Sequence, residues 1–373
     1  MISVRAARLL DRWGGLPACA LLAPAWRRPG RPLPAAPERV LVLKFWEGGL
    51  IVMGAPWFRA LRRRYPGAKI DFLTLDVNAQ LAAMAGAADS VLALRVTAGL
   101  PAFFLDLLRL LPRLRAARYS LLLDLEFMSR FSAVLTALLR PGFAVGFSHP
   151  GAWRGRFHDA PVPFRDDRHM TENYAAFFAA AGAEAGPEDR APLEAAAELP
   201  GLPAGERPVV LNFDRKDVMP ERAWPRENYL ALLDRLLSAG HRVAVIAQRR
   251  VELPDRAGLR NLSGLLDYRQ LAALFARSAL FITHDSGPLH IAAAMGCRTV
   301  SIFGPETPAG YEPLGPGHKA LYLGLPCSPC VNALRGKELV CVRRSNECVT
   351  NITPEMALRA AEELIGGSAS VGG

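Results

Sequence analysis

Residues 284–296, HDSGPLHIAAAMG, place an acid, a hydroxyl, a glycine and a histidine at the junction of an apolar run and an Ala-rich stretch. The run before them, ALFIT, predicts a buried strand, and Pro288 suits the first turn of a helix. Gly287 would let the backbone approach a ligand closely, and the amide groups at the amino end of this helix would hold a phosphate. His290 adds a proton donor, whereas the carboxylate of Asp285 suits sugar hydroxyls. The alternative interpretation is an ordinary helix cap.

Four of the six cysteines occur in one short stretch, and their spacing is that of a compact thiolate cluster. Thiolates are preferred ligands of Zn²⁺, and four of them close a tetrahedral structural site that has no open position for catalysis. We expect structural zinc, with free or redox-active thiols and disulfides as the alternatives. The candidate ligands are Cys327, Cys330, Cys341 and Cys348.

Strands that alternate with helices must position these groups. From residue 38 on, apolar runs of strand length alternate with helical patterns, which predicts parallel βαβ units in a doubly wound sheet. The alternation stops over residues 181–207, a linker rich in Ala, Gly and Pro. We therefore predict two Rossmann-like α/β domains, at 38–180 and 208–373, that face each other across a ligand-binding cleft. The helical pattern of residues 99–119 is expected to break at Pro112.

The chain has 373 residues, a net charge of +10 and 51% hydrophobic residues. The positive charge is either a solvated surface or a match for an anionic partner such as a nucleotide, a phosphorylated lipid or a membrane face. No apolar run reaches the roughly 20 residues of a spanning helix. Residues 1–37 combine arginines with Leu, Ala and Trp. This extension is either a membrane-interfacial segment, with Trp13 and Trp26 at headgroup depth, or a simple packed extension.

Residues 284–313 resemble the signature of the family 9 glycosyltransferases, the heptosyltransferase family of bacterial lipopolysaccharide assembly. The shared pattern is Asp-Ser-Gly, two residues, His, a small-residue helix, a strand and a Phe-Gly turn that ends in proline. Residues 41–74, 121–147 and 222–246 are similar to other segments of the family, in the expected order. The resemblance therefore extends from about residue 39 to residue 366.

The resemblance implies a two-domain GT-B fold and an inverting sugar transfer, commonly of heptose from ADP-heptose, to a phosphorylated, lipid-linked core oligosaccharide. It implies no catalytic cofactor, no nucleic-acid partner, and a cytoplasmic protein that is peripheral on the anionic inner face of the inner membrane. Arg222 stands where the family often has a phosphate-binding lysine, and Glu252 is expected to accept from the ribose. The expected donor residues are Arg222, Glu252, Asp285, Ser286, Gly287 and His290, and the expected acceptor residues are Arg59, Arg62, Arg63 and Arg130.

The first turn, FWEGGLIVMGAP, departs from the family pattern. Family members place an aspartate directly after the glycine of this turn, but this chain has Leu50 there, and leucine cannot accept a proton. Glu47 is our leading candidate for the general base, with Asp124 and Glu126 as alternatives that point to one side of a predicted strand. A protein that binds a nucleotide sugar or glycolipid without catalysis is a second hypothesis. An unrelated Rossmann enzyme such as an epimerase is disfavoured, because no G-x-G-x-x-G follows the first strand.

Overall fold

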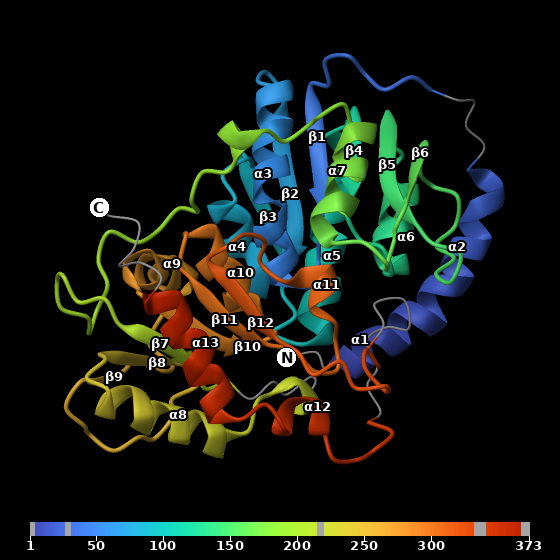
Figure 1. Ribbon diagram of the computed structural model, residues 1–373. Helices are drawn as coiled ribbons and strands as arrows, with labels where there is room; N and C mark the ends of the chain where they lie inside the picture. Colours follow the sequence, from blue (N-terminus) through green and yellow to red (C-terminus); the bar gives the residue numbers. More distant parts are fainter. Residues whose placement is uncertain (1–3, 27–30, 215–219, 332–340, 367–373) are drawn as a thin grey trace. The chain divides into compact units, whose positions relative to one another are not determined.

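The computed structural model describes residues 4–26, 31–214, 220–331 and 341–366 (Figure 1). These residues form two compact units, each with its own parallel six-stranded sheet, and the units divide between Ala191 and Pro192. The division falls inside the predicted linker. The part of the linker before this division packs on the first unit through Asp189, which pairs with Arg63. The part after it contacts the second unit, where the N–H of Ala196 donates to the carbonyl of Arg269. Two doubly wound sheets were predicted, and both are confirmed.

The first sheet has the strand order β3-β2-β1-β4-β5-β6, and all neighbouring strands are parallel. Since the chain winds outward in one direction from β1 and in the other from β4, their carboxyl ends form a topological switch point, where ligands of such sheets bind. Leu43 of β1 is in register with Asp124 of β4 at this point. The strands are β1 Arg39–Leu43, β2 Lys69–Leu75, β3 Ser90–Leu94, β4 Leu121–Asp124, β5 Phe143–Ser148 and β6 Ala160–Pro163.

Helices cover both faces of the first sheet. In Figure 1, α3 and α7 lie in front of the sheet, and α5 and α6 lie behind it. Aromatic side chains fill the front layer, where the rings of Phe58 and Phe72 lie 5.4 Å apart, and leucines dominate the back layer. The helical segments after β1 are α3 Gly48–Arg64, η3 Asp76–Asn78, α4 Ala79–Met84, α5 Leu100–Ala116, α6 Arg130–Leu139, α7 Met170–Ala180 and η4 Pro187–Asp189.

Two features of this unit differ from the sequence-based expectation. The helix α5 continues through Pro112 instead of breaking, because Pro112 lies on its exposed side, where water can bond the carbonyl that the proline ring leaves without a donor. The strand β6 was not expected, since it contains Pro161 and Pro163. It lies at the edge of the sheet, where a missing N–H costs little.

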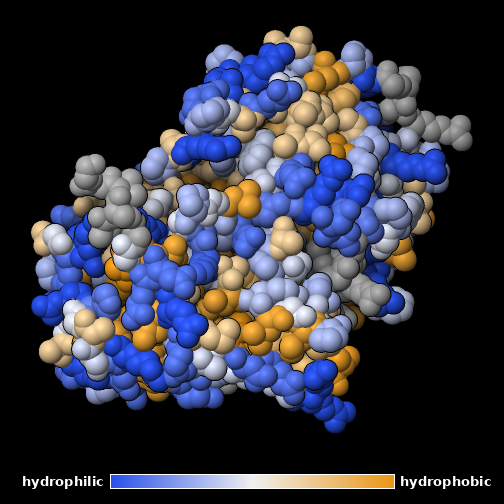
Figure 2. All heavy atoms as spheres, in the orientation of Figure 1, coloured by the Kyte–Doolittle hydropathy of each residue, from blue (hydrophilic) through white to orange (hydrophobic). Residues whose placement is uncertain are grey.

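The N-terminal extension is helical and packs on α6. It consists of α1 Val4–Leu10, the π-helical η1 Asp11–Gly15, α2 Leu16–Leu22 and η2 Ala23–Ala25. Trp26 is half-buried and stacks edge-on against Phe157 at 5.6 Å, a contact that the packed alternative expects. Trp13 points outward and is 72% exposed. Figure 2 shows hydrophobic residues (orange) exposed among hydrophilic ones on the face in view.

The second sheet repeats the topology of the first, with the order β12-β11-β10-β7-β8-β9 and a switch point between β7 and β10. Its core lies between the central strands and the helices α8 and α13. The strands are β7 Val209–Asn212, β8 Val243–Ile246, β9 Leu259–Asn261, β10 Leu280–His284, β11 Thr299–Ile302 and β12 His318–Leu321. The helices are η5 Pro220–Arg222, α8 Arg226–Ser238, α9 Tyr268–Arg277, α10 Gly287–Ala294, α11 Pro308–Tyr311, α12 Glu347–Thr350 and α13 Pro354–Gly366. Within the described part of the chain, no helix is long and apolar enough to cross a membrane.

Candidate functional site

The strand β10 carries the predicted phosphate-binding residues to the carboxyl edge of the second sheet. Ser286 is the N-cap of α10, with extended backbone (φ −153°, ψ 159°), and the helix begins at Gly287. A Cβ added at Gly287 would meet no other atom within 4 Å, so the space beside the first turn is open. The amide groups at the amino end of a helix carry partial positive charge, and this space therefore suits a phosphate.

Buried polar side chains hold Ser286 in place. Its hydroxyl oxygen lies 3.0 Å from the hydroxyl oxygen of Thr283. The side-chain amide of Asn212 donates to Thr283 at 3.0 Å and to Ser286 at 3.4 Å. Asn212 ends β7, the strand beside β10, so the switch point itself supplies this support. Neither Asn212 nor Thr283 is among the predicted site residues, although a polar residue that ends a buried strand is a signal that could have found Asn212.

A buried arginine and two carboxylates lie at the same edge. Nη1 of Arg222 lies 3.0 Å from Oδ2 of Asp285, and its Nη2 donates to Glu306. All three side chains are buried, and because unpaired buried charges are costly, the arginine makes the two carboxylates tolerable. The predicted Arg222 and Asp285 are thus brought together. Glu306, in the turn after β11, was not predicted, and an acid that follows a buried strand is the signal that could have found it.

The other two predicted donor residues differ in their surroundings. His290 lies in the first turn of α10 and is buried. Glu252 is exposed beyond β8, and its backbone carbonyl accepts a bond from Arg226. Its role toward a ribose stays a prediction.

The turn after β1 is held from two sides. Oε1 of Glu126 accepts hydrogen bonds from the backbone N–H groups of Phe45 (2.7 Å) and Trp46 (3.0 Å). The side-chain amide of Asn78 donates to the carbonyl of Phe45 at 2.7 Å. The next residue, Glu47, is half-buried and left-handed (φ 62°, ψ 74°) at the N-cap of α3. A non-glycine residue in this conformation is strained, and such strain persists where the surrounding structure imposes it.

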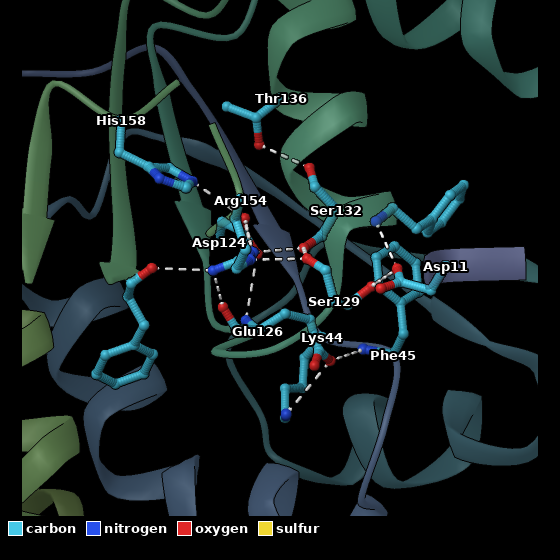
Figure 3. A network of polar contacts seen from close by, with 12 residues as sticks. Asp11, Lys44, Phe45, Asp124, Glu126, Ser129, Ser132, Thr136, Arg154 and His158 are labelled. Atoms are coloured by element: carbon cyan, nitrogen blue, oxygen red, sulfur yellow. Dashed lines mark hydrogen bonds and ion pairs between the residues drawn. The ribbon is translucent and has the colours of Figure 1, made fainter. Parts of the chain in front are cut away.

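The two alternative bases are buried in a polar network (Figure 3). Besides the turn, Glu126 pairs with Nζ of Lys44 at 3.3 Å. Asp124 pairs with Arg154, and its Oδ2 lies 3.0 Å from Nε2 of His158. Since β4 ends at Asp124, the side chains of Asp124 and Glu126 have separate partners rather than forming the expected pair on one strand face. Leu50 is buried, as its apolar side chain requires.

Burial alone would raise the pKa of Asp124. The Arg154 guanidinium and the hydrogen bonds of His158 and Ser132 outweigh this effect, so the pKa lies below its ordinary value. Arg154 also donates to the carbonyl of Ser129 at 2.7 Å and to that of Phe147 at 2.9 Å. It therefore ties the ends of β4 and β5 to the start of α6, which is a structural role.

The four predicted acceptor arginines all have partners within the first unit. Arg59 donates to backbone carbonyls of residues 189 and 191, Arg62 pairs with Asp89, and Arg63 pairs with Asp189. These three arginines lie in the last two turns of α3, at the opposite end of the helix from Glu47. Arg130, at the start of α6, lies on the carboxyl side of β4 and donates to the carbonyl of Trp153. Acceptor binding by these residues stays a prediction.

Two of the predicted zinc ligands, Cys330 and Cys348, lie against the turn that carries Glu306. The backbone N–H of Cys330 donates to the carbonyl of Pro305 at 3.0 Å. A Cβ added at Gly304 would lie 3.1 Å from Sγ of Cys348, so only glycine permits this contact without a shift. The loop of Cys327 and Cys330 and the helix α12 therefore brace this turn from one side.

The thiols also act on one another. Burial, and then the charges of Cys330, Cys341 and Cys327, raise the pKa of Cys348 to about 11. Backbone N–H groups, that of Asn346 foremost, lower the pKa of Cys341. The described cysteines form no disulfide. No group of three or more His, Cys, Asp or Glu side chains in the described ranges is arranged to hold a metal ion, and zinc stays a prediction.

Comparison with known proteins gives a consistent result. Residues 107–341 match glycosyltransferase family 9 (heptosyltransferase). The chain is 30% identical to lipooligosaccharide heptosyltransferase 2 of Haemophilus influenzae over 43% of its own length and 48% of the relative. It thus spans about half the length of this curated relative.

Solved structures share the fold. The Escherichia coli ADP-heptose lipopolysaccharide heptosyltransferase II superposes with a TM-score of 0.65 at 20% identity, over 89% of this chain and 100% of that one. The iron-containing dodecameric glycosyltransferase TibC of enterotoxigenic E. coli superposes with a TM-score of 0.56 at 16% identity, over 90% and 77%. These structures establish the GT-B architecture for the chain.

The lowered pKa of Asp124 predicts a specific acid sensitivity. Its stabilising contribution is present above the unfolded-state pKa of about 3.9 and is lost as the pH falls through the folded-state pKa. Asp124→Asn should lower the free energy of unfolding at neutral pH by about 3 kcal/mol, because Arg154 loses its counter-charge. It should also flatten the loss of stability below about pH 4. Urea unfolding at a series of pH values measures both effects. If the free energy of unfolding of the variant falls below pH 4 as steeply as that of the wild type, the lowered pKa of Asp124 is contradicted.

Proposed function

Because the chain belongs to glycosyltransferase family 9 (heptosyltransferase), we propose that it is an inverting glycosyltransferase that transfers a heptose from ADP-heptose to a lipopolysaccharide core acceptor. The observation that carries this proposal is the open space beside Gly287, at the amino end of α10. The two residues before Gly287 are the buried Ser286 and Asp285, which pairs with Arg222. ADP-heptose or a fluorinated analogue of it is named in the descriptions of several structural relatives.

The second unit would bind the donor. The amide groups of α10 would receive the diphosphate, and the negative charge that develops as ADP leaves would be stabilised there without a metal ion. Asp285 and Glu306 would orient the guanidinium of Arg222 toward the leaving group, since arginine has several donors in a fixed plane. His290, in the same first turn, would add a further donor.

The first unit would supply the general base, and we assign this role to Glu47. Asp124 and Glu126 are buried, and each is already paired with a cation. Glu47 is half-buried in the turn at the switch point. Its carboxylate would take the proton of the acceptor hydroxyl while that oxygen attacks the anomeric carbon. The bond from this carbon to the diphosphate oxygen breaks, ADP leaves with the electron pair, and the configuration inverts.

Gly287→Ala tests the donor site. The added methyl group meets no atom of the protein, so the melting temperature should stay unchanged. The methyl group would occupy space needed by the diphosphate, and ADP-heptose should bind about tenfold more weakly or worse by calorimetry. Gly67→Ala is the matched control, because its Cβ also meets nothing within 4 Å. Equal affinity of the two variants would refute the donor site, and a parallel panel of GDP- and UDP-sugars tests the nucleotide.

Glu47→Gln tests the base. The change keeps the size of the side chain and removes the proton acceptor, so kcat should fall by about 10²- to 10⁴-fold while the Kd for ADP-heptose stays unchanged. Glu126→Gln is the comparison variant. It should mainly lower the melting temperature, since Lys44 and the turn lose a charged partner. Full activity of Glu47→Gln would remove the residue from this role.

A catalytically silent binding protein is the second candidate, since the usual aspartate position is the buried Leu50. It predicts that the wild type binds ADP-heptose but shows no turnover with any lipopolysaccharide core acceptor. Sustained turnover by the wild type excludes it.

We also propose that the four cysteines hold one structural zinc ion. The type and number of the donors fit, because thiolates are preferred ligands of Zn²⁺ and four cysteines occur between residues 327 and 348. The ion would connect the loop after β12 to α12 and so support the turn that carries Glu306. Its role would be structural rather than catalytic. Four thiolates leave no open position for a substrate.

Metal analysis of the purified full chain should give about one zinc per chain. Cys348→Ser should lose the metal and lower the melting temperature, whereas Cys297→Ser, whose residue is buried away from the cluster, should retain it. One iron per chain would keep the site and overturn the choice of zinc. A metal-free protein with an unchanged melting temperature in Cys348→Ser would overturn the site.

A further inference from the structure

The N-terminal helices have two apolar faces. Leu9, Trp13, Leu16 and Leu21 repeat at spacings of three to five residues and are exposed, with 72% of Trp13 and 80% of Leu21 accessible. A surface helix normally presents polar residues to water. A face of this kind on a helix that is already packed on its other side indicates contact with something other than water.

The inner face accounts for the attachment of these helices. Oδ1 of Asp11 accepts a hydrogen bond from the backbone N–H of Phe131 at 2.8 Å and from the hydroxyl of Ser129 at 3.1 Å, at the amino end of α6. Cys19 is fully buried against α6, and a Cβ on Gly15 would lie 2.7 Å from Cβ of Arg130. The inner face therefore holds these helices on α6, and the outer apolar face stays exposed among the described residues of this unit.

The helix α5, which also contacts α6, repeats the pattern. Phe103 and Leu107 face the core, whereas Phe104, Leu105 and Leu108 are exposed. The two helical elements that flank α6 thus both present large apolar side chains outward.

The charges on these faces have one sign. Arg12 is exposed beside Trp13, with its guanidinium 5.7 Å from the ring, and Arg109 and Arg113 are exposed on α5. The N-terminal helices and α5 each contain a single acidic residue, and each of these forms an ion pair within the protein. Asp11 pairs with Arg130, and Asp106 pairs with Arg95. Exposed arginines beside tryptophan and leucine complement anionic headgroups with apolar chains beneath them.

We propose that the outer faces of α1–α2 and α5 bind the surface of an anionic lipid bilayer. The helices would lie in the plane of the interface, with the leucines at the acyl boundary, Trp13 at headgroup depth and the arginines on lipid phosphates. A second copy of the chain suits this surface less well, since a self-complementary contact would bring the arginines of both copies together. The proposal does not depend on sugar transfer, although it would hold the protein where a lipid-linked acceptor lies.

Vesicle flotation of the full chain, without nucleotide sugar, tests the proposal. The wild type should float with vesicles of phosphatidylethanolamine and phosphatidylglycerol, and less so at high salt. Leu21→Glu should weaken this binding about tenfold, because an apolar anchor is replaced by a charge that anionic lipid repels. Arg12→Gln should weaken it about fivefold on anionic vesicles and leave any binding to phosphatidylcholine unchanged.

Leu314→Glu is the matched control, because Leu314 is 62% exposed in the second unit. It should float as the wild type does, and circular dichroism should show that all variants are folded. The proposal is overturned if the wild type does not float at low salt, or if Leu21→Glu floats equally well. A wild-type dimer that Leu21→Glu dissociates, without any vesicle binding, would assign the surface to a second copy instead.

Discussion

Buried carboxylates stand at the carboxyl edges of both sheets, and each of them requires a buried cation. Asp124 has Arg154, Glu126 has Lys44, and Asp285 shares Arg222 with Glu306. A buried charge without a partner costs several kcal/mol, so these pairs constrain the loops from which their members come. The strand ends and the turns that follow them are held in one arrangement by this requirement. The candidate site depends on that arrangement.

The two units use the same topology for different purposes. In the first, the carboxylate of Glu126 organises the turn after β1 and leaves Glu47 in a left-handed conformation at the start of α3. In the second, the edge carries the amino end of α10, where a Cβ added at Gly287 would meet nothing within 4 Å. In the proposed function, the first switch point would supply the carboxylate and the second would supply the amide groups that an inverting transfer from a diphosphate requires.

Segments outside the two sheets are fastened to these edges. The cysteine-bearing loop and α12 support the turn of Glu306 through Pro305 and Gly304. The N-terminal helices are attached to α6 through Asp11, whose carboxylate lies at the positive end of that helix. Each addition uses one strong local contact and a small residue that permits close approach. The two sheets therefore have the same topology, although different additional segments are attached to each of them.

The alternation of apolar runs and helical patterns sufficed to predict both sheets, because strand and helix periodicities are local properties. It did not predict β6, whose prolines are tolerated only because the strand lies at an edge, or the continuation of α5 through Pro112. The sequence signature around Asp285 and Ser286 predicted the strand, turn and helix of the proposed donor edge for a similar reason, since the three are contiguous there.

Which acid is buried and paired is a property of distant segments. Glu126 and Asp124 lie four and six residues from Arg130, yet their partners are Lys44, Arg154 and His158, far away in the chain. The same holds for Glu306 and Arg222, which are 84 residues apart. The sequence by itself determined the fold class, the family and the helix that would receive a phosphate, because these depend on local pattern. Only the tertiary structure decided which carboxylates are committed to ion pairs, because electrostatic pairing depends on distance in space.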